Sequence, residues 1–239
     1  MEKVIFNWSG GKDSSLCLLK LLESDQYDIC RLLTTVNQEK GRVSMHGIRE
    51  ELIHLQAGQI GIPLHCVMLP DQLDMEQYDR IMSESLQAFK REGVHLGAFG
   101  DIFLEDLRKY RENKLREINV EAIFPLWNKD TDRLAREFID LGFRAIIVSA
   151  DGRKLDASFV GREFDHQFLK DLPEGVDPCG ENGEFHSFVF DGPIFKDPVS
   201  FEKGKLVERS YEAPGDSAYS FSNRPAQGSS WFLDLLPDN

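Results

Sequence analysis

The chain has 239 residues, of which 41% are hydrophobic and 29% are charged, a composition typical of globular proteins. Its formal net charge of −13 argues against a broad surface for DNA or RNA, because such a surface needs clustered lysine and arginine. The sequence contains no run of about 18 apolar residues that could span a bilayer and no signal-peptide core. We therefore predict a cytoplasmic protein with no membrane or nucleic-acid partner.

The first half of the chain alternates between predicted strands and helices. Apolar runs predict strands at residues 4–8, 29–36, 64–69, 95–103 and 122–126. Apolar residues at helical spacing predict helices at residues 14–23, 48–60, 75–92 and 104–118. Such alternation is typical of an α/β fold with a mostly parallel, five-stranded sheet covered on both faces. Ligands of such sheets bind beyond the carboxyl ends of the strands.

The pattern changes after residue 127. A helix is expected within residues 128–142, with Asp130 or Thr131 as its cap. A strand is expected at 143–151 and a further apolar strand at 185–195, separated by segments rich in Gly, Pro and Asp.

This change predicts two domains. The first is an α/β domain at residues 1–127, and the second is a smaller C-terminal α+β domain at 128–239. From residue 211 onward the sequence has little regular pattern, so we expect a surface tail there.

The most informative motif is SGGKDS at residues 9–14, between the first predicted strand and helix. Its two glycines let the backbone bend tightly and present N–H groups, and the helix adds the positive end of its dipole. Lys12 can neutralise phosphate charge, while Ser9 and Ser14 can donate hydroxyl hydrogen bonds. The motif therefore predicts a phosphate-binding loop.

Asp13 is the unusual member of this loop, because a carboxylate repels phosphate. It fits if a Mg²⁺ ion lies between the two, since Mg²⁺ is typically held by one or two carboxylates plus phosphates. A Walker A loop is excluded because Phe6 stands where glycine is required and Asp13 where Ser or Thr is required. The loop is not G-x-G-x-x-G either, which disfavours dinucleotide redox chemistry.

A second motif, CGENGEFH at residues 179–186, combines two carboxylates with an amide and a histidine. Glu181, Asn182 and Glu184 could position an ammonium, a hydroxyl or a metal ion. They could equally cap the backbone of a turn. From the residue types alone, the functional and the structural interpretation remain equally open.

The four cysteines provide no zinc motif, because no two are closer than 13 residues. Cys17, Cys30 and Cys66 stand in apolar runs and are predicted to be small core residues. Cys179 could be a nucleophile, but a thiolate needs a cationic neighbour and the nearby charges are mostly acidic.

The phosphate loop, placed directly after an N-terminal strand, resembles the PP-loop of the ATP pyrophosphatases, which cleave ATP between the α and β phosphates. The segment CGENGEFHSFVFDGPIF, together with GDIFLEDLRKYRE at 100–112 and FPLW at 124–127, resembles the diphthine–ammonia ligase family, in its short prokaryotic-type branch. The resemblance covers about residues 1–195. It implies a Rossmann-like (HUP-type) fold that uses ATP and Mg²⁺. The domain at residues 1–127 would bind ATP through the PP-loop, and the domain at 128–239 would bind the substrate.

The family resemblance implies that ATP adenylates a carboxylate, with release of pyrophosphate, and that ammonia then converts the adenylate to an amide. The carboxylate would be diphthine on a translation elongation factor, or a related one. The residues implied to bind ATP and its metal are Ser9, Gly10, Gly11, Lys12, Asp13 and Ser14, with Asp13 as the metal ligand. The implied catalytic residues are Lys12, Asp101, Glu181 and Glu184, and the implied substrate contacts are Asn182, His186 and His46.

Two other functions remain as alternatives. One is a tRNA-modifying PP-loop enzyme, which the missing CxxC and the acidic charge disfavour. The other is a non-catalytic nucleotide sensor, although Lys12 and Asp13 exceed what binding alone needs. Arg108, Lys109 and Arg111 are interpreted as a solvated helix face paired with nearby acidic residues. A homo-oligomer is left open.

Overall fold

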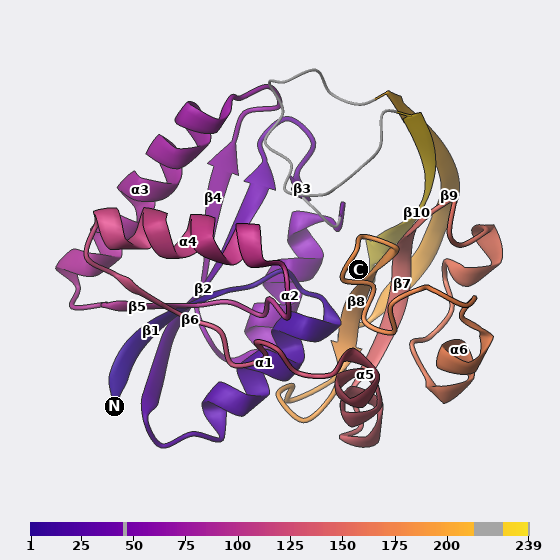
Figure 1. Ribbon diagram of the computed structural model, residues 1–239, viewed down its shortest axis with the longest axis horizontal. Coiled ribbons are helices and arrows are strands. Elements are labelled where there is room, and N and C mark those ends of the chain that lie inside the picture. The colour runs from indigo at the N-terminus through magenta and orange to yellow at the C-terminus, as the bar shows by residue number, and fades with distance from the viewer. Residues whose placement is uncertain (45–46, 213–226, 239) are drawn as a thin grey trace.

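The computed structural model describes residues 1–44, 47–212 and 227–238, which form two sheets with helices around them (Figure 1). Within these residues, sheet A has six strands. They are β1 (Glu2–Asn7), β2 (Tyr27–Asn37), β3 (Arg42–Val43), β4 (Leu64–Leu69), β5 (Leu96–Ala98) and β6 (Glu121–Ile123).

The expected five-stranded parallel sheet is confirmed. Its parallel strands lie in the order β4-β2-β1-β5-β6, and the two-residue β3, which the sequence did not predict, pairs antiparallel with the end of β2. The chain runs outward in one direction from β1 through β2 to β4, and in the other through β5 to β6. The strand order therefore reverses between β1 and β5, which is where open α/β sheets bind their ligands.

Four helices cover sheet A: α1 (Lys12–Leu22), α2 (Glu50–Ile60), α3 (Met75–Arg91) and α4 (Glu105–Glu117). Figure 1 shows α3 and α4 on one face, and α1 and α2 on the face turned toward the second sheet. Strand β1 contributes apolar side chains to both faces of the sheet. Val4 and Phe6 belong to the core around α1 and α2, while Ile5 belongs to the cluster under α3. A strand buried on both faces in this way reads as a continuous apolar run.

Some of the helices have a side-chain N-cap and others do not. Asp74 and Gln77 form a capping box on α3, and Asp130, one of the two predicted caps, accepts from the N–H of Arg133 at 2.8 Å in α5 (Thr131–Asp140). Helix α1 differs, because its cap position is Gly11, which offers no side chain. The N-terminus of α1 is thus left for other partners.

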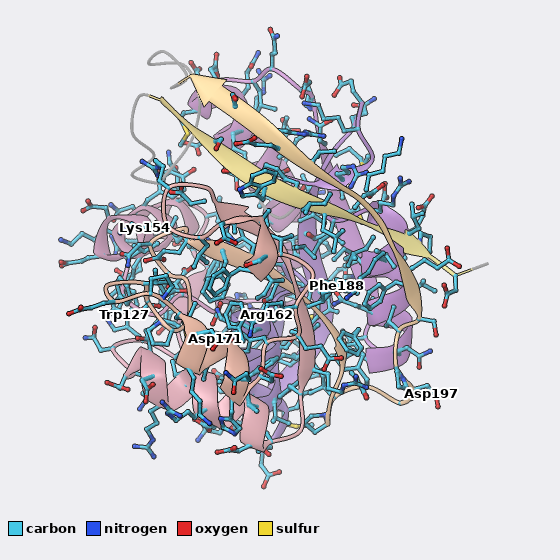
Figure 2. All side chains as sticks on the ribbon, turned by 90° about the vertical axis from the view of Figure 1, so that its right-hand side faces the viewer. Trp127, Lys154, Arg162, Asp171, Phe188 and Asp197 are labelled. Atoms are coloured by element: carbon cyan, nitrogen blue, oxygen red, sulfur yellow. The ribbon has the colours of Figure 1, made fainter. Side chains whose placement is uncertain are left out.

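Sheet B is antiparallel and has the order β8-β7-β10-β9. Its strands are β7 (Arg144–Asp151), β8 (Phe185–Asp191), β9 (Phe201–Glu212) and β10 (Gln227–Pro237). A short 3-10 helix (Ala157–Phe159) and α6 (His166–Asp171) follow β7. Figure 2 looks at the molecule from this side and shows Arg162 beside Asp171, with Nη2 and Oδ2 2.6 Å apart.

The expectation of little regular structure after residue 211 was wrong for residues 227–237. They form β10, which lies between β7 and β9 and pairs with both. This strand depends on partners far away in sequence, so its local pattern gave no signal. Residues 213–226 lie outside the described part of the chain.

One hydrophobic cluster runs from sheet A through α1 and α2 to sheet B. It contains Phe6 and Leu52 from the first half as well as Ile147 and Phe188 from the second. The division into two domains near residue 127 therefore stays a prediction. None of the described helices is long and apolar enough to cross a membrane.

Candidate active site

The loop between β1 and α1 carries the predicted phosphate motif. Gly10 has a φ of 78°, a left-handed conformation that glycine adopts at little cost. Ser9 Oγ accepts from the N–H of Gly11 at 3.3 Å and donates to Ser14 Oγ at 3.0 Å, and Ser14 donates onward to the Gly11 carbonyl at 2.9 Å. These bonds close a compact turn at the N-terminus of α1, where the helix dipole favours an anion.

A buried glutamine fixes this turn from behind. A Cβ on Gly10 would lie 2.6 Å from Ile53 Cδ1 and 2.7 Å from Gln56 Oε1, so nothing larger than glycine fits. Gln56 is fully buried; it donates to the Gly10 and Val189 carbonyls and accepts from Trp8 Nε1 at 3.0 Å. The side chain of one residue on α2 thus joins the phosphate loop to β8.

Replacement of this glutamine is expected to destabilise the fold. In Gln56→Leu, the Trp8 N–H and the Val189 carbonyl lose their side-chain partner inside the core. The free energy of unfolding is expected to fall by about 2 kcal/mol, because a buried polar group left unpaired costs about 1–3 kcal/mol. Urea unfolding followed by tryptophan fluorescence measures this. Gln87→Leu, an exposed position on α3, is the control, and an equal loss in both variants would contradict the bridging role.

Lys12 is the buried cation of the site, with 5% of its side chain exposed. Its Nζ lies 2.6 Å from Asp13 Oδ2, donates to the Cys179 carbonyl, and lies 5.9 and 5.6 Å from the ring centroids of Phe164 and Phe185. Burial works to lower the pKa of Lys12, but Asp13 and other acidic neighbours outweigh it and raise the pKa above its usual value. Lys12 therefore stays positively charged.

The N-terminus of α1 is met by β8, from the other half of the chain. The N–H of Lys12 donates to Ser187 Oγ at 3.1 Å. Side chains alternate along a strand, so Phe185 and Ser187 both face Lys12 whereas His186 lies on the opposite face of β8. His186 therefore points away from the side of β8 that meets Lys12.

The loop at residues 177–184 crosses over Lys12 and is held by its own side chains. Glu184, 2% exposed, accepts from the Asp177 N–H at 3.2 Å, from the Asn182 N–H at 2.9 Å and from Asn182 Nδ2 at 3.1 Å. Asp177 in turn accepts from the N–H groups of Cys179 and Glu181. The carboxylate of Glu184 and the amide of Asn182 thus bond to each other within the loop.

Cys179 contributes its backbone rather than its thiol. Its carbonyl accepts from Lys12, while its Sγ lies 3.3 Å from the Thr131 carbonyl. Burial raises the pKa of the Cys179 thiol above its usual value. The thiol therefore stays protonated, which argues against a nucleophilic role.

Asp101 enters the site from the loop after β5. A Cβ on the preceding Gly100 would lie 3.2 Å from the backbone of Asp13 and Ser14, so the two loops are in close contact. Asp101 Oδ2 lies 3.2 Å from Arg111 Nη1 but has no hydrogen-bond partner, although it is buried. Burial raises the pKa of Asp101, while Arg111 opposes the shift and Asp13 adds to it.

Glu181 reaches the same place from the 177–184 loop. It accepts a backbone hydrogen bond from Ile102, next to Asp101, and experiences the charges of Asp13, Lys12 and Asp101. Burial, followed by the charge of Asp13, raises the pKa of Glu181 to about 8. The loops after β1 and β5 and the loop before β8 thus bring three carboxylates and one ammonium together.

This raised pKa predicts a pH-dependent stability for the ligand-free protein. Between its ordinary value of 4.5 and about 8, Glu181 has ionised in the unfolded chain but still holds its proton in the folded one. Its contribution to stability is therefore complete below about pH 4.5 and is lost as the pH rises toward 8. Thermal unfolding across this range should show a smaller decline for Glu181→Gln than for the wild type.

The matched control for that series is Glu174→Gln, which removes one exposed carboxylate from the segment just before the same loop. Its profile is expected to follow the wild type. If Glu181→Gln also followed the wild type, Glu181 would not be the group that titrates.

The carboxylates fit a magnesium ion. A buried carboxylate oxygen that accepts no hydrogen bond is costly, and a hard cation would add to the one charge partner, Arg111, that Asp101 Oδ2 has. Asp13 and Asp101 come from the two loops that touch at the switch point of the sheet. Carboxylate oxygens of this kind, together with phosphate oxygens, are the ligands that Mg²⁺ takes in proteins.

Four residues singled out in the sequence remain: His46, and Arg108, Lys109 and Arg111 on α4. His46 lies outside the described residues. Arg108 pairs with Glu112 one turn away, but its guanidinium also lies 4.6 Å from the ring centroid of Trp127, so it is only partly solvated. Lys109 is exposed and pairs with Glu105 one turn away along α4, which confirms the interpretation as a solvated helix face for Lys109. Arg111 does not follow it, because its partner is Asp101 (Nη1 to Oδ2, 3.2 Å) and it stacks on the Phe99 ring.

Comparison with known protein families shows which family this chain matches. A family described as diphthamide synthase N-terminal domain matches residues 2–122, and one described as diphthamide synthase C-terminal domain matches residues 130–212. The chain belongs to the diphthamide synthase family. The resemblance based on the PP-loop and the GENGEFH motif is thereby confirmed.

Individual relatives of this chain carry a common name. A Bos taurus protein named diphthine–ammonia ligase is 31% identical over 134 residues, covering 54% of this chain and 49% of the relative. A Danio rerio protein of the same name is 25% identical over 233 residues, covering 86% and 88%. The chain spans about half the length of the mammalian relatives that it matches.

One solved structure similar to this chain is described as a predicted subunit of tRNA methyltransferase from Methanocaldococcus jannaschii. It shares 18% identity with a TM-score of 0.40, covering 65% of this chain and 80% of that one. A likeness at this level carries no argument about function.

Proposed function

We propose that this chain is an ATP-dependent ligase that joins ammonia to a carboxylate. The observation that carries the proposal is the convergence of Lys12, Asp13, Asp101 and Glu181 at the switch point of sheet A. One fixed cation and several carboxylates at the end of a parallel sheet suit a polyphosphate bound with magnesium. The name diphthine–ammonia ligase, carried by relatives across the family, supports this reaction class.

The loop at residues 9–14 would bind ATP. The hydroxyls of Ser9 and Ser14 and the backbone of Gly10 and Gly11 lie where the α1 dipole favours phosphate. Lys12 would exchange its bond to the Cys179 carbonyl for one to a phosphate oxygen. Its burial removes competing water, so its charge acts at full strength on the developing charge of the reaction.

Asp13 and Asp101 would hold Mg²⁺, and the ion would supply neutralisation of phosphate charge. Arg111 would hold Asp101 in place, because the ion pair and its stacking on Phe99 fix the guanidinium. Gly100 lets the loop after β5 approach the backbone of Asp13 closely, and the two carboxylates would hold the ion from these two segments.

The proposed chemistry has two steps. An oxygen of the substrate carboxylate attacks the α-phosphorus of ATP, the bond from that phosphorus to the bridging oxygen breaks, and pyrophosphate leaves. Ammonia then attacks the acyl carbon of the adenylate, AMP leaves with the electron pair of the broken C–O bond, and one proton is released. Positioning and charge stabilisation supply most of the catalysis in such displacements.

Glu181 is the group we assign to that proton. A carboxylate with a pKa of about 8 can exchange a proton with ammonium or with the attacking amine near neutral pH. Glu184 and Asn182 receive a different role from the one expected, because their polar atoms bond to each other. We propose that they position the loop that carries Glu181 and the Cys179 carbonyl.

The proposed substrate is diphthine on a translation elongation factor, with ammonia as the nitrogen source. The net charge of −13 supports a partner other than nucleic acid, and we propose a cytoplasmic location. Leu206 and Val207 on the edge strand β9 are exposed, which would allow a homo-oligomer.

The test uses the full chain with ATP, Mg²⁺, ¹⁵N-labelled ammonium and an elongation factor that carries diphthine. We expect the label to appear as an amide on the modified histidine, as read by mass spectrometry of the peptide. ADP in place of ATP serves as the control and is expected to give no label. Label incorporation without ATP, or none with ATP and diphthine together, would overturn the proposal.

A further inference from the structure

A second group of potential ligands lies on the outer side of α2. Glu50 and His54 are one turn apart on this helix, and their side chains are 30% and 55% exposed. Their neighbours Ile53 and Gln56 on the same helix are buried against Gly10. The helix therefore has one face that supports the phosphate loop and another that presents a carboxylate and an imidazole to solvent.

Strand β4 supplies a third donor to this exposed face. On β4, His65 packs its ring against Phe89 of α3, with centroids 4.9 Å apart, and Val67 joins the same cluster. Alternation along the strand places Cys66 on the opposite face, where its Sγ lies 3.7 Å from His54 Nε2. Cys66 is partly exposed, so the prediction that it is a core residue was wrong.

The distances within this group match those of a tetrahedral zinc site. Around zinc, with bonds of about 2.1 Å to N and O and about 2.3 Å to S, neighbouring N and O atoms lie about 3.4 Å apart and N and S about 3.6 Å apart. Here His54 Nε2 lies 3.5 Å from Glu50 Oε1 and 3.7 Å from Cys66 Sγ, and all three ligand atoms lie within 4.8 Å of one another. The three ligand atoms are therefore close enough together for one ion to lie between them.

We propose that Glu50, His54 and Cys66 bind a zinc ion, with a fourth position open to water. Thiolate and imidazole together favour zinc over the harder magnesium expected at the phosphate loop. The three ligands come from one helix and the strand that follows it, separated by 3 and 11 intervening residues. A motif search based on cysteine pairs does not find this spacing.

A bound zinc ion would also change the protonation of Cys66. Burial, together with Glu50, raises the pKa of the Cys66 thiol to about 11, so without a cation the thiol stays protonated. Zinc binding would displace that proton, and affinity would rise with pH. The ion would tie the exposed face of α2 to the edge strand of sheet A.

The test uses the full chain after dialysis against a chelator, titrated with Co²⁺ and then with Zn²⁺. We expect one equivalent of Co²⁺ to give tetrahedral ligand-field bands and a thiolate-to-cobalt charge-transfer band, and Zn²⁺ to displace it. Cys66→Ser should remove the charge-transfer band. It should weaken zinc at least about tenfold, because loss of even an outer-shell partner costs about 10–100-fold.

Two further variants complete the design. Cys30→Ser changes a cysteine of β2 whose Sγ lies near the Val4 carbonyl, and it should keep both the band and the zinc affinity. His54→Ala alters an exposed side chain, so it tests the site even if Cys66→Ser fails to fold. A wild type that binds zinc no more tightly than His54→Ala, or a charge-transfer band that depends on Cys30, would overturn the proposal.

Discussion

The variant Lys12→Met is expected to lower kcat for ATP-dependent amide formation about 1,000-fold, at the upper end of what loss of one preorganised donor costs. Lys12 is the buried cation at the N-terminus of α1, and its charge persists because Asp13 lies 2.6 Å from its Nζ. Methionine keeps most of the length of the side chain and its apolar character beside the rings of Phe164 and Phe185, but it removes the charge. The measurement is pyrophosphate release at saturating ATP.

The matched control for this variant is Lys20→Met, on the last turn of the same helix. Lys20 pairs with Glu137 and is about one-third exposed. It lies near the end of α1 opposite to the phosphate loop. We expect it to keep close to wild-type turnover. If Lys12→Met retained similar activity with an intact fold by circular dichroism, Lys12 would serve only to hold the 177–184 loop in place.

The second large effect is expected from Glu184→Ala. The carboxylate accepts three hydrogen bonds inside its loop, and this same loop supplies the carbonyl that Lys12 contacts. Its loss should lower the free energy of unfolding by about 2 kcal/mol, since buried donors are left unpaired. It should also lower kcat about 100-fold, because small displacements of catalytic groups have effects of that size.

Two readouts separate positioning from direct catalysis at Glu184. Urea unfolding and steady-state kinetics should change together in Glu184→Ala, and Glu184→Gln should recover part of both, because an amide oxygen still accepts. Glu174→Ala, an exposed neighbour, should change neither. A variant of full stability with no activity would instead show that Glu184 acts directly on the substrate, the role expected from the sequence.

The phosphate loop could be predicted because its signal is local. Two glycines between an apolar strand and an apolar-patterned helix leave few other conformations, and Gly10 adopts the left-handed one. The parallel sheet was predictable for the same reason, since each strand is a short apolar run followed by an amphipathic helix. Asp101 became a candidate only through the family resemblance.

The supports of the site could not be predicted, because they join residues far apart in sequence. Gln56 contacts Gly10 46 residues away and Val189 133 residues away, and Ser187 meets Lys12 across 175 residues. Nothing in a helix that reads ELIHLQAGQI shows that its glutamine is buried against a loop. The different roles of Glu181 and Glu184 could not be predicted either. Only the fold shows that Glu184 bonds within its own loop, whereas Glu181 lies near Asp13, Lys12 and Asp101.

The central claim is cleavage of ATP between the α and β phosphates, coupled to amide formation. Phosphorus-31 NMR of a reaction with ATP, Mg²⁺, ammonium and the diphthine-bearing elongation factor tests it most directly. We expect the ATP signals to be replaced by those of AMP and pyrophosphate. The release of AMP with formation of the amide should require ammonium. Signals of ADP and orthophosphate would contradict the account, because they would place the cleavage at the γ-phosphate.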